Sequence, residues 1–189
     1  MNFEISNENR LVADTVRRFI KERLAPLEAG IDAADEIDPA VIRALKKEVI
    51  ALGLFGYNMP AALGGPDLSV ATQCLIDEAL GHTTMALAEA FGHLPGSLRA
   101  ASAEQREWLV KPLMQAQTTI AYALTEPAAG SDLSAVATRA EQVPGGWRLN
   151  GTKHFISAAE HADYLIVLAV TDKVAPLKSR FTTFVIERN

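Results

Sequence analysis

The chain has 189 residues, of which 49% are hydrophobic and 22% charged, enough for one good core or two small ones. Its formal net charge of −5 arises in residues 1–118, since residues 119–189 hold seven basic and seven acidic residues. Neither part has the basic stripe of a nucleic-acid-binding protein, and no apolar run approaches the ~20 residues of a membrane span. The N-terminus lacks the pattern of a signal or transit peptide, so we expect a soluble, cytoplasmic protein. Cys74 is the only cysteine, which excludes an intrachain disulfide, and its apolar neighbours predict a buried core residue.

Residues 1–118 show the periodicity of amphipathic helices. A first helix is predicted by apolar residues that recur at steps of three and four and so share one face: Val12, Val16, Phe19, Ile20, Leu24 and Leu27. A second helix is predicted to begin at Asp38, whose side chain can cap free N–H groups, because Pro39 fits the first turn without losing a hydrogen bond. Ser69 is a similar cap for a third helix.

Two further helices are predicted before the pattern changes. One covers residues 84–100, with a bend or a break at Gly92 and Pro95. The other begins at a capping box formed by Ser102 and Gln105, and Pro112 is expected to end it.

The remaining residues show the pattern of strands. Residues 138–141 and 147–149 alternate in polarity, and Pro144-Gly145-Gly146 between them predicts a turn. Asn150-Gly151 is a strong signal for a tight hairpin. The apolar run Tyr164–Val170 is typical of a strand that is covered on both faces.

This order of elements predicts an α+β protein with two domains. Residues 1–118 would form an all-α helical domain, and residues 119–189 an antiparallel β-domain. Phe181–Ile186 is the last candidate strand, and a sheet of this size usually needs another strand or a covering element. We therefore expect the β-domain to be incomplete in this chain.

The segment Tyr122–Asp132, with the sequence YALTEPAAGSD, is the most informative in the chain. It begins as a short apolar strand, breaks at Pro127 and ends in small residues that leave backbone N–H groups and hydroxyls accessible. Such groups suit a phosphate or the polar rim of a flat ring, although an ordinary exit from a strand has the same features. Two later motifs accompany it, Lys153–Ser157 (KHFIS) and the pair Ala162-Asp163 before an apolar strand.

Together and in this order, YALTEPAAGSD, LNGTKHFIS and Ala162-Asp163 resemble the acyl-CoA dehydrogenase family, and the N-terminal helices fit it too. The resemblance implies FAD on a middle β-domain and the oxidation of acyl-CoA to trans-2-enoyl-CoA in fatty acid metabolism. It also implies that electrons pass to an electron-transfer flavoprotein. The family fold that it implies has an N-terminal helical domain, a middle β-domain and a C-terminal helical bundle, usually in a homotetramer.

The resemblance assigns cofactor contacts to eight residues: Tyr122, Leu124, Thr125, Gly130, Ser131, Phe155, Ile156 and Ser157. Thr125 and nearby backbone groups would bond the polar edge of the flavin ring. Phe155 would lie against the ring and exclude water. The Ser157 hydroxyl would bond near the ring nitrogen that accepts the hydride. Gly130 and Ser131 would reach the pyrophosphate.

Substrate contacts are expected from Ser131 and Lys178, toward the coenzyme A arm, and from Phe91, in the acyl pocket. The residues alone leave two alternatives open, a solvated loop at Lys178 and an ordinary core face at Phe91. No metal site is predicted, because the four histidines lack metal-ligand spacing with cysteines or carboxylates.

In the family the catalytic carboxylate lies in the C-terminal helical domain, which this chain does not reach, so no catalytic residue is predicted in it. Glu126 is the acid nearest the flavin motif, but it precedes Pro127 in a turn, where an acid usually bonds local backbone. We therefore expect the chain alone to be inactive. The alternatives are a same-fold acyl-CoA oxidase or flavin-dependent hydroxylase, and a truncated module that binds a partner without catalysis.

Overall fold

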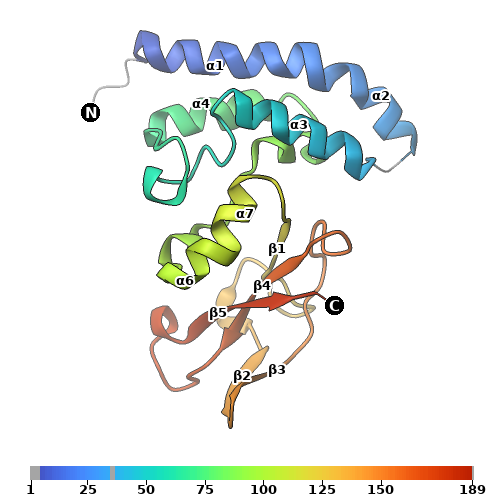
Figure 1. The fold of residues 1–189 in the computed structure, drawn as a ribbon. Coiled ribbons are helices and arrows are strands. Elements are labelled where there is room, and N and C mark those ends of the chain that lie inside the picture. Colours follow the sequence, from blue (N-terminus) through green and yellow to red (C-terminus); the bar gives the residue numbers. More distant parts are fainter. Residues whose placement is uncertain (1–4, 35–36, 189) are drawn as a thin grey trace. The chain divides into compact units, whose positions relative to one another are not determined.

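The computed structural model describes residues 5–34 and 37–188. The chain divides into two compact units, Met1–Ala116 and Gln117–Asn189, and the boundary predicted at residue 118 lies two residues further on. The first unit is helical and the second is built on a sheet, which confirms the predicted order of elements (Figure 1). No helix in the described ranges is both long and apolar enough to cross a membrane.

The first unit begins with a long helical segment, as the apolar periodicity predicts. It comprises α1 (Asn7–Phe19), a π-helical turn (Ile20–Leu24) and α2 (Ala25–Ala34). The predicted inward face is real, since Val16 and Leu24 are fully buried. Burial of such side chains stabilises the fold by about 1.5–3 kcal/mol each.

Two capped helices follow, α3 (Pro39–Ala51) and α4 (Val70–Leu80). The carboxylate of Asp38 accepts a hydrogen bond from the Ala40 N–H, and the Ser69 hydroxyl accepts one from the Thr72 N–H, so both predicted caps are confirmed. The prediction for Cys74 is wrong, because this cysteine is exposed. The buried face of α4 instead carries Thr72, Ile76, Ala79 and Leu80.

The rest of the first unit consists of short helical pieces. The helix predicted over residues 84–100 is broken into α5 (Met85–Ala88) and two 3₁₀ turns, Glu89–Phe91 and Gly96–Ala100. Another 3₁₀ turn, Ala61–Leu63, precedes α4. The break is placed by Gly92, which has a φ of +62°, and by Pro95, as the sequence suggests.

The last helical segment of this unit runs through α6 (Ala103–Gln105), a π-helical turn (Arg106–Val110) and α7 (Lys111–Met114). The predicted capping box is confirmed. Pro112 does not end the helix, which corrects the prediction. It lies in the first turn of α7, directly after the π-helical turn, where a missing N–H is tolerated.

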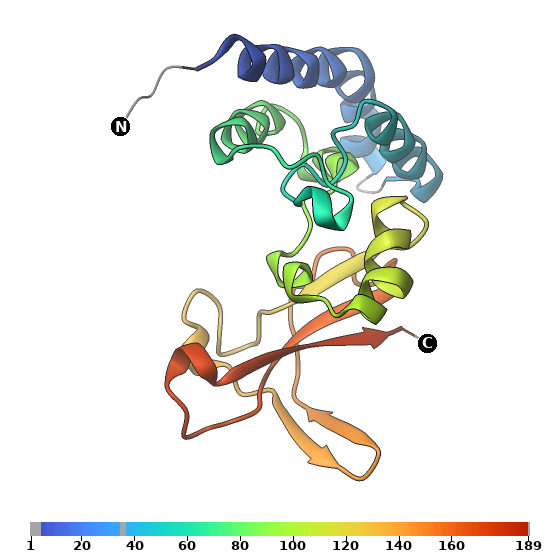
Figure 2. The same cartoon turned by 60° about the vertical axis from the view of Figure 1, so that its left-hand side comes forward.

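The sheet of the second unit has five strands: β1 (Ile120–Ala123), β2 (Arg139–Val143), β3 (Gly146–Asn150), β4 (Tyr164–Val170) and β5 (Phe181–Glu187). The β2–β3 and β4–β5 pairs are antiparallel, as predicted, but β1 and β2 both pair with β4 in parallel, so the sheet is mixed. A parallel pair needs a long connection, and the whole segment between β1 and β4 supplies it. Figure 2 shows the β2–β3 hairpin extending away from β4 and β5.

The core of the second unit supports the segment that carries the flavin motif. Buried Ala129, Val136, Leu168 and Val170 form one cluster, against which Leu124 and Phe181 pack. Two short 3₁₀ turns, Leu133–Ala135 and Leu177–Ser179, lie in the loops of this unit. The polar end of the motif is therefore anchored by apolar side chains on both sides of it in sequence.

Asn150-Gly151 does not form a hairpin turn, which is a second correction. Asn150 ends β3 and pairs with Arg139 in β2, while the turn of that hairpin lies at Pro144–Gly145. Gly151 is needed for another reason. A Cβ built on it would lie 2.3 Å from the Oγ1 atom of Thr138, so two backbone segments approach here more closely than a side chain allows.

Candidate functional site

The end of β1 and the loop that carries KHFIS meet in space. The backbone N–H of His154 donates a hydrogen bond to the Thr125 carbonyl at 2.9 Å. The ammonium of Lys153 donates another to the Leu124 carbonyl, also at 2.9 Å. Two segments that the sequence separates by almost thirty residues are therefore neighbours, as the flavin interpretation requires.

A buried ion pair joins the same two segments. Glu126 is 6% exposed, and its Oε1 atom accepts hydrogen bonds from Lys153 Nζ at 2.8 Å and from the Thr138 N–H at 2.9 Å. Its Oε2 atom accepts from the Ala137 N–H at 2.7 Å. The carboxylate thus holds the loop with Lys153 on one side and the start of β2 on the other.

These contacts decide the charge of Glu126. Burial alone would raise the pKa of its carboxyl, but the hydrogen bonds from Lys153 and from the backbone outweigh burial and lower the pKa to about 2. A carboxylate with so low a pKa is a poor proton acceptor at neutral pH. Glu126 therefore has a structural role, and the sequence signals only that it lies in a turn and not that Lys153 reaches it.

An aromatic side chain projects from the KHFIS loop. Phe155 is 83% exposed and its backbone has a φ of +54°, a left-handed conformation that is rare for a bulky residue. Its ring stacks on the His154 ring, with 3.6 Å between centroids. Ala158, in the same loop, also has a positive φ of +58°. Strained backbone of this kind gathers at functional sites, and here it holds an apolar ring outward.

Several polar groups of the predicted flavin site are free to bind a ligand. In the part of the chain that the structure describes, the hydroxyls of Thr125, Ser131 and Ser157 have no protein partner. A Cβ added to Gly130 would meet no atom within 4 Å, so the backbone there is open to a ligand. Tyr122 adds a second aromatic ring, 40% exposed.

The half-buried Leu124 and Ile156 complete the predicted set of eight. Exposed aromatic rings and free hydroxyls are the groups that suit the apolar face and the polar rim of a flavin. The position of each residue relative to FAD remains a prediction.

The pair Ala162-Asp163 has a positioning role. Ala162 is buried, and Asp163 Oδ2 accepts hydrogen bonds from the N–H of Thr119 at 2.7 Å and from its hydroxyl at 2.8 Å. The contact fixes the start of β1 beside the start of β4.

The predicted substrate residues are spread over both units. Ser131 and Lys178 are exposed in the second unit, and Lys178 lies in the 3₁₀ turn Leu177–Ser179. Phe91 is fully buried in the first unit, where its ring packs edge-on against Phe19 with 5.5 Å between centroids. Contacts of these residues with a substrate remain predictions. Within the described residues there is no group of three or more His, Cys, Asp or Glu side chains that could hold a metal ion.

Both units of the chain match known protein families. Residues 6–117 match the acyl-CoA dehydrogenase N-terminal domain, and residues 121–189 match the acyl-CoA dehydrogenase middle domain. The benzylmalonyl-CoA dehydrogenase of Aromatoleum aromaticum is 36% identical over 194 residues, which cover 100% of this chain and 49% of that protein.

Solved structures of other proteins also resemble this chain. The glutaryl-CoA dehydrogenase of Mycobacterium smegmatis matches with a TM-score of 0.81 and 28% identity over 97% of this chain and 46% of its own. An FAD complex of PigA matches with a TM-score of 0.83 and 26% identity over 100% of this chain and 50% of its own. The chain spans about half the length of these relatives. Because both of its units match domains of one family in the same order, the chain belongs to the acyl-CoA dehydrogenase family.

Proposed function

We propose that this chain provides the flavin-facing part of an FAD-dependent acyl-CoA dehydrogenase, which in complete form oxidises acyl-CoA to trans-2-enoyl-CoA. The observation that carries the proposal is the contact between the end of β1 and the KHFIS loop through Lys153 and His154. It brings Tyr122–Thr125 beside Phe155–Ser157, the two groups of residues assigned to the flavin ring. FAD, when bound, supplies an acceptor for a hydride.

The chain's own residues hold and surround the ring. The free hydroxyl of Thr125 and nearby backbone groups bond its polar edge, while the exposed ring of Phe155 covers one part of it and excludes water. The Ser157 hydroxyl bonds near the nitrogen that accepts the hydride. The open backbone at Gly130 and the hydroxyl of Ser131 reach the diphosphate, which needs close approach without a side chain in the way.

Proton abstraction from the substrate is assigned to a group outside these 189 residues. Glu126, the acid closest to the motif, is held in a buried ion pair and is a poor base. Ser131 and Lys178 are proposed to contact the coenzyme A arm, and Phe91 the acyl group. For the complete protein we propose a cytoplasmic homotetramer in fatty acid metabolism, with an electron-transfer flavoprotein as the electron acceptor.

A titration of the 189-residue chain with FAD tests the proposal. We expect a shift in the visible flavin spectrum that saturates with added protein. Phe155→Ala should weaken binding roughly two- to tenfold through loss of the aromatic contact, and Ser157→Ala should change the spectrum. Leu177→Ala, which also removes an exposed apolar side chain from the second unit, is the matched control and should change neither. An unchanged spectrum in both site variants would contradict the flavin assignment.

A further inference from the structure

Among the described residues, the aromatic contact of Phe155 is with its neighbour in sequence, His154. The two rings lie almost flat on each other, with 3.6 Å between their centroids and 21° between their planes. Phe155 is nevertheless 83% exposed, so its ring rests on the imidazole on one side and meets solvent elsewhere. Neither residue belongs to a strand, so pairing with a neighbouring strand does not hold the two side chains in place.

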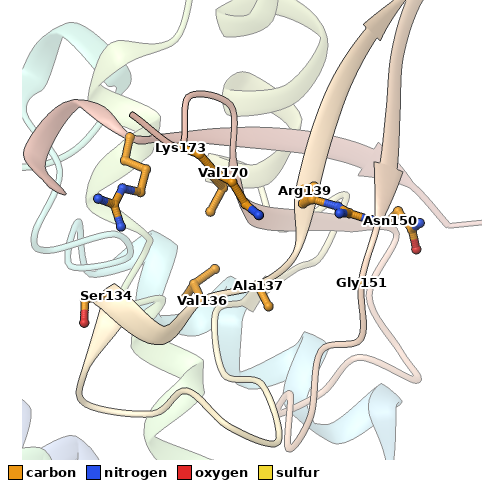
Figure 3. Close-up of a pocket in the computed structure, with 9 residues that line it drawn as sticks. Ser134, Val136, Ala137, Arg139, Asn150, Gly151, Val170 and Lys173 are labelled. Atoms are coloured by element: carbon orange, nitrogen blue, oxygen red, sulfur yellow. The ribbon is translucent and has the colours of Figure 1, made fainter. Parts of the chain in front are cut away.

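The loop that carries both rings starts from a fixed point. The chain leaves β3 at Gly151, and Figure 3 shows Gly151 in the wall of the same pocket as Ala137, just before β2 begins. A Cβ built on Gly151 would lie 2.3 Å from the Oγ1 atom of Thr138, so the two segments are in direct contact there. Close packing of this kind leaves the first residue of the loop little freedom.

The next residues of the loop are bound to the end of β1. Lys153 donates a hydrogen bond to Glu126 at 2.8 Å, and the N–H of His154 donates one to the Thr125 carbonyl at 2.9 Å. The imidazole therefore projects from backbone that is held in place. In the described part of the chain, no hydrogen bond holds the backbone of Phe155, and its left-handed φ of +54° persists only where other contacts support it. The stack on His154 is such a contact.

We propose that His154 is a positioning residue, whose imidazole holds the ring of Phe155 ready to receive a flat apolar ligand on its free face. An imidazole suits this role because its face can stack while the nitrogens at its edge stay in water. A phenyl ring without a partner would move among its rotamers, and a ligand would have to offset the entropy of fixing it. That the ligand is the flavin ring rests on the proposed function, whereas the stack does not.

Nuclear magnetic resonance of the 189-residue chain without ligand tests the stack. The chain has seven phenylalanines, and the ring signals that vanish in Phe155→Ala belong to Phe155. We expect these signals upfield of those of a solvated phenyl ring, because the imidazole face shields them. They should move back in His154→Leu and stay upfield in His154→Tyr, whose ring can stack. His161→Leu makes the same change at another exposed histidine of the loop and should leave them unmoved.

Titration of the same variants with FAD tests the use of the stack. His154→Leu should weaken binding roughly two- to tenfold, as the loss of an aromatic pair does, while His154→Tyr and His161→Leu should bind like the unaltered chain. In a Phe155→Ala background His154→Leu should have no further effect, because His154 acts only through Phe155. His154 is exposed, so its variants should fold, and circular dichroism checks that they do.

The outcomes separate this inference from the proposed function. If Phe155→Ala weakens FAD binding but His154→Leu changes neither binding nor the signals of Phe155, the positioning role is overturned and the proposed function stands. An equal loss of binding from His154→Leu with and without Phe155 also overturns the role, because His154 would then act on the ligand or the loop directly. If His154→Leu moves the signals but neither variant affects FAD binding, the stack stands and the proposed function fails.

Discussion

The replacement Glu126→Gln is expected to destabilise the second unit by about 3 kcal/mol. A carboxyl whose pKa falls from 4.5 to about 2 on folding stabilises the folded state by roughly 3 kcal/mol at neutral pH. Removing one partner of a buried ion pair typically destabilises a protein by about 3–5 kcal/mol, which agrees with the value obtained from the pKa of Glu126. Glutamine keeps the shape but leaves the ammonium of Lys153, whose side chain is 11% exposed, without a counter-charge.

The effect has a defined pH dependence. Because the pKa of Glu126 is lower in the folded state, the stabilisation is complete above the unfolded pKa of 4.5 and is lost as the pH falls toward about 2. The unaltered chain should therefore lose about 3 kcal/mol over this interval through Glu126 alone. The Glu126→Gln variant should not show that part of the loss.

Urea unfolding measured by the fluorescence of Trp147 reports on the second unit, since this residue lies in β3 with its ring 5.5 Å from that of Phe184. A Trp108→Phe background removes the signal of the first unit. Lys153→Met and the double variant complete a mutant cycle, in which the double variant should be less destabilised than the sum of the single changes. Glu160→Gln, at an exposed acid, is the control. Equal midpoints and equal acid sensitivity for the two Glu→Gln variants would refute the reasoning.

Three other tests address the packing and the chemistry. Gly151→Ala should destabilise the second unit by about 1–3 kcal/mol in urea because its Cβ would clash with Thr138, whereas Gly130→Ala has open space and should be neutral; equal effects would disprove the close approach. Asn58→Leu should cost the first unit about 2–4 kcal/mol, because it removes two buried hydrogen bonds to the backbone of Leu94, and an unchanged melting curve would contradict this. The chain alone should not reduce an artificial electron acceptor with any acyl-CoA, and turnover would place a base within it.

Local features of this fold could be read from adjacent residues. Asp38 and Ser69 cap their helices as predicted, because a cap depends on a hydrogen bond to a residue two or three positions away. Features that depend on distant segments could not be predicted from adjacent residues. Asn150-Gly151 has the composition of a turn, but pairing with Arg139 keeps Asn150 in a strand. Cys74 has apolar neighbours, but the packing of α4 turns it outward.

The candidate site likewise combines features that the sequence predicts with features that depend on distant segments. The motifs around Thr125 and Phe155 could be recognised by resemblance, and the hydrogen bond between Thr125 and His154 shows that they meet. The role of Glu126 could not be predicted, because its partners at Ala137 and Lys153 are reached only after the chain has folded back.

The loop that presents Phe155 is held at its two ends by carboxylates and not by strand pairing. Residues 151–163 contain no strand, and one end is fixed by Lys153 on Glu126 while the other is fixed by Asp163 on Thr119. The sheet itself is held by backbone hydrogen bonds and apolar packing, which do not titrate. Protonation of Glu126 should therefore loosen the loop before it unfolds the sheet, so that flavin contacts made by Phe155 are lost at a higher pH than the fluorescence change of Trp147. Coincident acid transitions for the two probes would show instead that the loop and the sheet form one cooperative unit.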